Sequence, residues 1–141
     1  MKIFKFLLIA FTAVILLAGC KAVESDEASI FPDGTYSDDF GGTHVFTTTQ
    51  WTDSFGAAFT VIDTNEEEKY IIYQNSASNT YNPSKFSRVD FTLDSSDNLY
   101  YCQIAYDKDT VAMAEAVTDA DANDLAGGCS GFAWSKLTPA S

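Results

Sequence analysis

The chain of 141 residues contains one histidine, His44, and this residue decides which acid–base chemistry the sequence could support. A hydrolase with a Ser-His-Asp triad would need His44 as its base, and serines and aspartates are plentiful. No Gly-x-Ser-x-Gly nucleophile motif is present, and His44 alternates with other residues in a segment typical of a strand. We therefore assign no catalytic residue and expect a structural or ligand-contacting role for His44.

Acidic residues form the second group with potential chemistry, since 20 Asp and Glu stand against eight Lys and Arg. An EF-hand that began at Asp119 would need Gly at its sixth position and Glu at its twelfth, but Asp124 and Ser130 stand there. Capped turns and helix starts account for these aspartates, and calcium bound in another geometry is the alternative. The acidity also opposes nucleic acid as a partner.

The first nineteen residues have the composition of a secretory leader. Lys2 and Lys5 precede an apolar run over 6–17, and small residues follow it. This run is shorter than the roughly 20 residues that a membrane-spanning helix needs. We therefore expect residues 1–19 to be a signal peptide, and the remaining chain to be more acidic than the whole-chain net charge of −12.

The leader ends in Leu17-Ala18-Gly19-Cys20, which resembles the lipobox of bacterial lipoproteins at all four positions. The resemblance implies cleavage before Cys20, a thioether lipid on its sulfur and acylation of the new N-terminus. Two or more acyl chains hold a protein stably on a bilayer, so a membrane is the implied partner. Lys21 stands where an aspartate would favour inner-membrane retention, which favours the outer membrane.

Two cysteines remain, Cys102 and Cys129. Two thiols and one distant histidine do not supply a metal site, so we expect no metal. A secreted chain lies in an oxidising compartment, and a disulfide between the two is then the expectation, with free thiols as the alternative. It would close a loop worth roughly 3.5 kcal/mol in the chain-entropy account.

The chain after the leader divides into a tether and one domain. Residues 20–31 are polar and acidic without a clear period, which predicts a lipidated N-terminus and a flexible tether. A turn signal opens the domain, which we expect to cover 32–139.

Period-two alternation with aromatic and β-branched residues predicts strands through this domain. In the segment 43–51 the alternation would put Val45 and Trp51 on one face and His44 and Phe46 on the other. The remaining segments with this pattern are 35–37, 55–61, 70–73, 88–93, 99–106 and 132–137.

One segment breaks the alternation. Residues 110–118 are alanine-rich and predict a short helix, which Asp109 or Thr110 can cap. Together the elements predict a mainly β fold: a small antiparallel β-barrel or β-sandwich of about seven strands, with a short helix before the last strand.

Several segments together resemble an uncharacterised family of hypothetical lipoproteins from Gram-negative bacteria. They are the run from Gly34 to His44, Trp51, the run 99–103, and Gly127-Gly128-Cys129 followed by Phe132 and Trp134. The family has no assigned activity, so the resemblance transfers no site. It supports the pairing of Cys102 with Cys129.

The function we expect is that of a lipid-anchored envelope lipoprotein, a binding or structural module without enzymatic activity or a cofactor. His44, Trp51 and Trp134 are the candidate ligand-contacting residues, because aromatic side chains line many small-ligand sites. The partner, protein or small molecule, stays open. Two alternatives are a small secreted hydrolase that uses His44 and an acidic calcium-binding surface protein.

Overall fold

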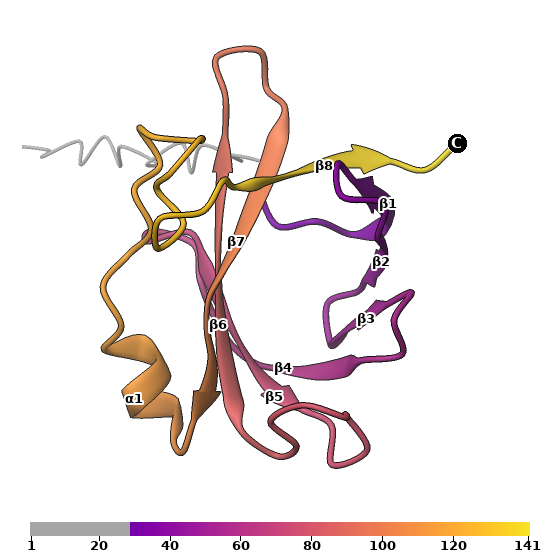
Figure 1. Cartoon of the computed structure of the whole chain (residues 1–141), viewed down its shortest axis with the longest axis vertical. Helices are drawn as coiled ribbons and strands as arrows, with labels where there is room; N and C mark the ends of the chain where they lie inside the picture. Colours follow the sequence, from indigo (N-terminus) through magenta and orange to yellow (C-terminus); the bar gives the residue numbers. More distant parts are fainter. Residues whose placement is uncertain (1–28) are drawn as a thin grey trace, which may run out of the picture.

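The computed structural model describes residues 29–141, so the signal peptide, Cys20 and most of the tether lie outside the described residues. Eight antiparallel strands follow one another around a closed barrel, in which β8 pairs with β1 (Figure 1). The mainly β fold with a short helix before the last strand is confirmed, and the barrel form is the one present. The elements are β1 Gly34–Asp38, β2 Thr43–Phe46, β3 Gln50–Asp53, β4 Ala58–Asn65, β5 Tyr70–Asn75, β6 Phe86–Leu93, β7 Leu99–Lys108, α1 Val111–Glu115 and β8 Ser135–Pro139.

The segment predicted as one strand over 43–51 is a hairpin of β2 and β3. Thr47 makes the turn: its backbone N–H donates to the Gln50 carbonyl at 2.8 Å, and its hydroxyl accepts from the Gln50 N–H at 3.0 Å. The turn brings Phe46 directly opposite Trp51, so Trp51 joins His44 and Phe46 inside the barrel while Val45 faces out. The expected sharing of faces is therefore wrong here, because a threonine turn resets the alternation without glycine or proline.

Stacked aromatic rings fill the centre of the barrel. The Trp51 ring lies parallel to those of Phe46 and Phe59, with centroids 5.6 and 4.3 Å away. Close beside the barrel's first strand, Phe31 packs edge-on against Phe91 at 5.6 Å and covers this cluster. Such rings each bury a large apolar area, so the core rests on a few large side chains.

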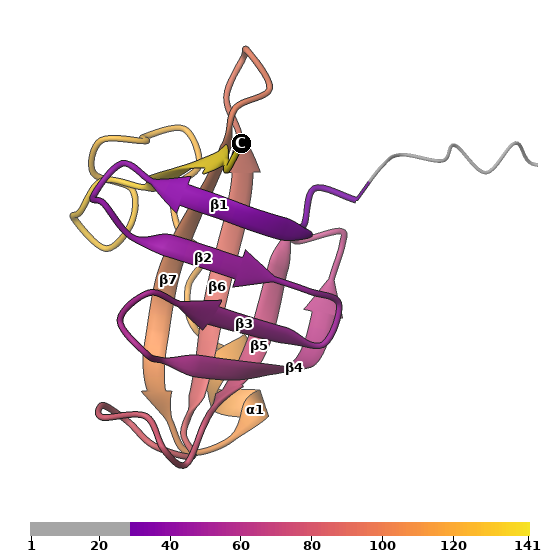
Figure 2. The same ribbon diagram turned by 90° about the vertical axis from the view of Figure 1, so that its right-hand side faces the viewer.

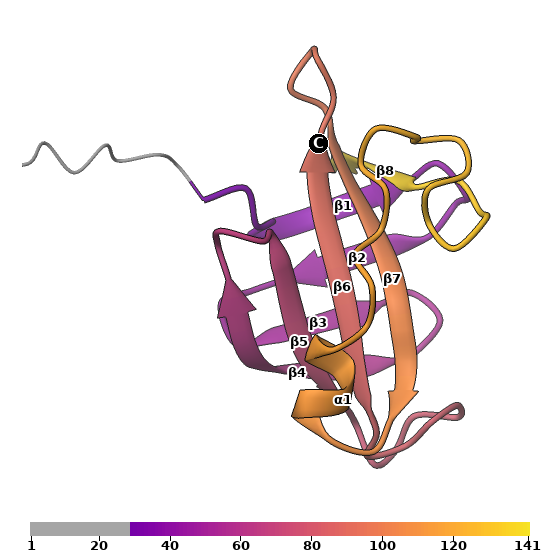
Figure 3. The ribbon, with the colours of Figure 1, turned by 90° about the vertical axis from the view of Figure 1, so that its left-hand side faces the viewer.

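The helix α1 lies against the outer face of β5 and β6 (Figure 3). The Thr110 hydroxyl accepts from the Met113 N–H and caps it, as predicted. Ala114 packs there against Tyr70 and Ile72 in a second apolar cluster. Within residues 29–141, no helix is long and apolar enough to cross a bilayer.

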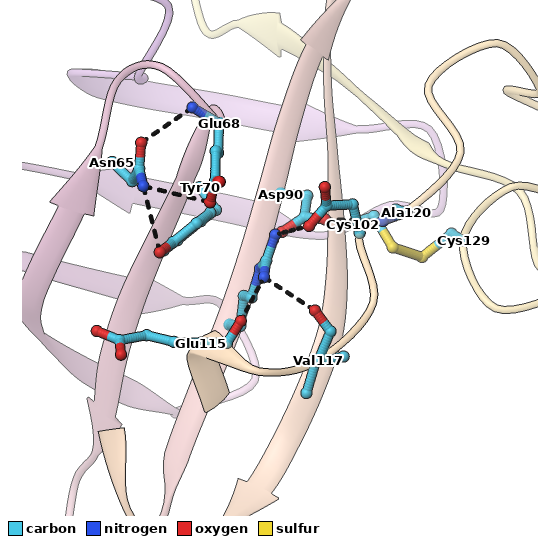
Figure 4. A network of polar contacts seen from close by, with 11 residues as sticks. Asn65, Glu68, Tyr70, Asp90, Cys102, Glu115, Val117, Ala120 and Cys129 are labelled. Atoms are coloured by element: carbon cyan, nitrogen blue, oxygen red, sulfur yellow. Dashed lines mark hydrogen bonds and ion pairs between the residues drawn. A yellow bond between two sulfur atoms is a disulfide. The ribbon is translucent and has the colours of Figure 1, made fainter. Parts of the chain in front are cut away.

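A buried arginine ties the chain after α1 to the same outer face. Arg88 donates to the carbonyls of Glu115 and Val117 at 2.9 and 3.0 Å and to Asp90 at 2.7 Å (Figure 4). Its guanidinium also lies 4.0 Å from the Tyr70 ring centre. This arrangement satisfies both a buried cation and the open C-terminal end of the helix.

The disulfide between Cys102 and Cys129 is present, with Cα atoms 5.7 Å apart (Figure 4). It fixes the connection between α1 and β8 to the outside of β7, in agreement with the expected pairing.

The barrel has two ends that differ in their coverage. Because neighbouring strands are antiparallel, the start of β1 lies at one end, and we call this the N-terminal end. The β1–β2, β3–β4 and β5–β6 connections all lie at the other, which we call the open end. The strands β1 to β4 run side by side between these ends in Figure 2.

Candidate functional site

A pocket of about 410 Å³ lies at the open end. It lies between the β3–β4 turn, the β5–β6 loop and the last part of β7, and its volume is within the range of small-ligand sites, which often occupy the mouths of β-barrels. The residues that line it are Asp53, Phe55, Gly56, Ala57, Phe59, Asn75, Asn79, Thr80, Tyr81, Asn82, Gln103 and Tyr106.

The β3–β4 turn holds one wall of the pocket in place. Asp53 Oδ1 accepts from the backbone N–H groups of Phe55 and Ala57, both at 2.9 Å. Gly56, at the tip of the turn, has a positive φ of 89°, which a residue with a side chain adopts at a cost. The turn therefore presents the Phe55 ring, which is 78% exposed, at the rim.

Two buried asparagines hold the β5–β6 loop. The Asn79 side chain pairs with the backbone N–H and carbonyl of Ala58, each at 2.9 Å, as a neighbouring strand would. The Asn75 amide donates to the carbonyls of Asn82 and Tyr106 at 2.8 and 2.9 Å. Each of these bonds satisfies a buried polar group, so the loop that carries Tyr81 has a fixed position before any ligand arrives.

The floor of the pocket combines the Phe59 ring with polar side chains. Phe59 covers the Trp51 ring from the pocket side. Beside it, the Ser87 hydroxyl donates to Asn75 Oδ1 at 2.6 Å and accepts from Gln103 Nε2 at 3.1 Å. An apolar surface with a few fixed polar groups is the usual composition of a small-molecule site.

His44 lies in a separate, closed network. Its Nδ1 accepts from the Trp51 indole N–H at 3.2 Å, and its Nε2 lies 3.0 Å from Asp38 Oδ2. Because an indole nitrogen only donates, Nδ1 carries no hydrogen, and we infer the tautomer with the proton on Nε2. The Tyr101 hydroxyl completes the network 3.3 Å from Nε2. His44 itself is 3% exposed.

The charge in this network rests on Asp38. Burial opposes its ionised form, but hydrogen bonds from His44 and from the backbone of Gly42 and Phe40 outweigh it, so the pKa of Asp38 lies below its ordinary value. Burial, together with the nearby Asp38 carboxylate, raises the pKa of the Tyr101 phenol. The network is thus one carboxylate surrounded by hydrogen-bond donors.

The structure brings together two of the three predicted ligand-contacting residues, but neither of them lines the pocket. His44 and Trp51 are inside the barrel with their polar atoms paired to each other. Trp134 lies outside it, where its indole N–H donates to the Asp121 carbonyl at 3.1 Å. None of the three lines the pocket, and their role in binding stays a prediction. Within residues 29–141, the ring nitrogens of His44 contact Trp51, Asp38 and Tyr101.

Aspartates of the acidic segments accept hydrogen bonds from backbone N–H groups in turns, and Asp119 forms an ion pair. Asp94 accepts from the N–H groups of Ser96 and Asn98, and Asp121 and Asp124 accept from backbone N–H groups in the same way. Asp119 pairs with Arg88. Across 29–141, no group of three or more His, Cys, Asp or Glu could hold a metal ion.

Sequence reasoning missed the pocket, although one signal for it was present: Tyr81 is an aromatic residue in a turn-rich segment, where a core does not require it. The strand predicted over 55–61 is wrong at its start, because Phe55 lies in the β3–β4 turn and β4 begins at Ala58. No known protein-family model, curated protein or solved structure matches the chain.

Proposed function

We propose that the chain is a lipid-anchored envelope lipoprotein whose barrel binds a small organic ligand at its open end. The observation that carries the proposal is the pocket itself. It combines exposed aromatic rings, buried polar groups and loops that hydrogen bonds already fix, and pre-formed pockets of this composition are typical binding sites.

The position of the pocket fits an anchor at Cys20. The chain enters the barrel through Ile30 and Phe31, which pack on the core next to the start of β1, whereas the pocket opens at the other end. A tether of about ten residues has an r.m.s. length of about 17 Å. A lipid on Cys20 would hold the barrel close to the bilayer and leave the pocket accessible.

Mass spectrometry of the chain produced in a Gram-negative host tests the anchor. We expect the mature protein to begin at Cys20 and to carry two or three acyl chains. Cys20→Ser should remain an uncleaved precursor without lipid. A mature wild-type protein without acyl chains would refute the anchor, whatever the pocket binds.

A titration with three small probes tests the pocket. The probes are phenethyl alcohol, phenethylammonium and hydrocinnamate, which share a phenyl ring and differ in charge. Trp51 fluorescence reports binding because its ring stacks on Phe59, at the pocket floor. We expect saturable binding of at least one probe by the wild-type chain.

Two matched variants assign the signal to the pocket. Tyr81 lines it and is 81% exposed, whereas Phe132 is 75% exposed and does not line it. Tyr81→Ala should weaken binding, and Phe132→Ala should leave it unchanged. If none of the three probes binds, or if both variants bind as the wild type does, the pocket is not a binding site.

A further inference from the structure

We infer that the open-end pocket takes a small organic ammonium ion. This inference rests on the proposed function and names the class of its ligand. The charge of the lining is its first support: Asp53 supplies a carboxylate, and no Lys, Arg or His is among the lining residues. The whole chain, with a net charge of −12, attracts cations and repels anions in addition.

The Asp53 carboxylate keeps one oxygen for a ligand. Its Oδ1 is engaged by the N–H groups of Phe55 and Ala57. Within the described residues, no side chain or backbone donor reaches Oδ2. The turn therefore fixes the direction of the carboxylate with one oxygen and leaves the other to pair with an ammonium N–H.

Aromatic rings supply the second feature that an ammonium ion needs. Phe55, Tyr81 and Tyr106 line the same pocket as Asp53 and are 78%, 81% and 56% exposed. The face of an aromatic ring attracts a cation, and several rings around one site are the arrangement used to bind organic ammonium groups. A neutral apolar ligand would use the rings but would leave the carboxylate without a partner, at a cost.

Several amide donors inside the pocket are already engaged. The Asn75 and Asn79 amides donate to backbone carbonyls, and Gln103 donates to Ser87. No donor in the described part of the chain reaches the Gln103 carbonyl oxygen. This carbonyl oxygen is therefore an acceptor that a ligand with N–H donors can use.

The test compares the three phenyl probes on the full-length chain in a non-ionic detergent, with the detergent signal subtracted. We expect phenethylammonium to bind roughly tenfold more tightly than phenethyl alcohol, the gain of one hydrogen bond to a charged group. Hydrocinnamate should bind most weakly. Added salt should weaken binding of the ammonium probe and leave the alcohol unchanged.

A pair of aspartate variants supplies the control. Asp53→Asn keeps the acceptor for the Phe55 and Ala57 N–H groups but removes the charge, so affinity for phenethylammonium should fall roughly tenfold. Asp63→Asn removes the same charge from an exposed site on β4 that does not line the pocket, and should bind as the wild type.

The outcomes separate the inference from the proposed function. Equal affinity for the ammonium and the alcohol, or an ammonium affinity that Asp53→Asn leaves unchanged, overturns the inference and leaves a pocket that binds neutral ligands. Tighter binding of hydrocinnamate overturns it as well. Absence of binding by every probe overturns both.

Discussion

Two polar clusters lie inside the open half of the barrel, and they differ in what they leave for a ligand. Around His44, each polar side-chain atom contacts another side chain or the backbone, and aromatic rings cover the group. Around Gln103, similar polar groups border a pocket of about 410 Å³. The polar groups of the first cluster bond to one another and hold strands together. In the second cluster, some polar groups have no partner within the described residues. A polar residue inside a barrel therefore points to binding only where its neighbours leave it a free partner.

The largest effect that separates the two clusters is expected from His44→Ala. The substitution leaves the Trp51 N–H without a partner in a buried site, leaves Asp38 Oδ2 with the Tyr101 hydroxyl alone at 3.4 Å, and removes a ring packed against Tyr101. We expect a loss of about 2–4 kcal/mol in the free energy of unfolding. Urea denaturation measures it.

Tyr81→Ala is the reverse case and makes the comparison testable in both directions. Because Tyr81 is exposed, its removal should change stability by no more than about 0.5 kcal/mol while it weakens probe binding. A small stability change in His44→Ala would contradict the structural role of the cluster around His44. A folded His44→Ala variant that no longer binds the probes would show that the two clusters are not separate.

The sequence predicted the fold better than the site, for a physical reason visible at 43–51. Alternation identifies strands because each side chain in a strand faces in or out. At Thr47 a hydroxyl makes the turn with no glycine or proline, so alternation counted through the turn assigned Trp51 to the outer face, whereas it lies inside the barrel. Both β2 and β3 were predicted to be strand. What the sequence did not show was the point at which β2 ends and β3 begins.

The pocket was missed because the prediction gave most weight to His44, whose residue type occurs once in the sequence. A single histidine and two tryptophans stand out in a sequence, but their polar atoms are used within the protein. Phe55 and Tyr81 were unremarkable among many aromatic residues. The pocket forms where hydrogen bonds from Asn79 to Ala58 and from Asn75 to Tyr106 connect parts of the chain that sequence alone does not bring together.

A further prediction uses pH to test the charge of the cluster around His44. The pKa of Asp38 is lowered in the folded protein from its ordinary 3.8, so its ionised form stabilises the fold. That contribution is complete above the unfolded pKa and is lost as the pH falls through the folded one. Asp38→Asn lacks it at every pH, and its amide would oppose the Nε2–H of His44.

We therefore expect Asp38→Asn to lose about 1.5–3 kcal/mol at neutral pH, and less in acid. Urea denaturation of both proteins from pH 7 to pH 2 gives the difference at each pH. Asp90 has a raised pKa because burial outweighs its bonds to Ala120 and Arg88, so its contribution has the opposite sign. It is common to both proteins and cancels. A difference that is constant over this range would refute the assignment to Asp38.

A last substitution, Trp51→Phe, acts at the border of the two clusters. The variant keeps an aromatic ring against Phe59 but is smaller than the buried indole, and it lacks the N–H that donates to His44 Nδ1. One hydrogen bond contributes about 0.5–1.5 kcal/mol and the smaller ring adds the cost of a cavity, so the loss of stability should be about 1–3 kcal/mol. Nitrogen NMR shifts of His44 should show the hydrogen on Nε2 in the wild type. Calorimetry should give unchanged probe affinity, because Phe59 still forms the floor of the pocket. A wild-type His44 with its hydrogen on Nδ1 would contradict the hydrogen bond from Trp51. A variant with a collapsed pocket would mean that the cluster around His44 holds the pocket in place.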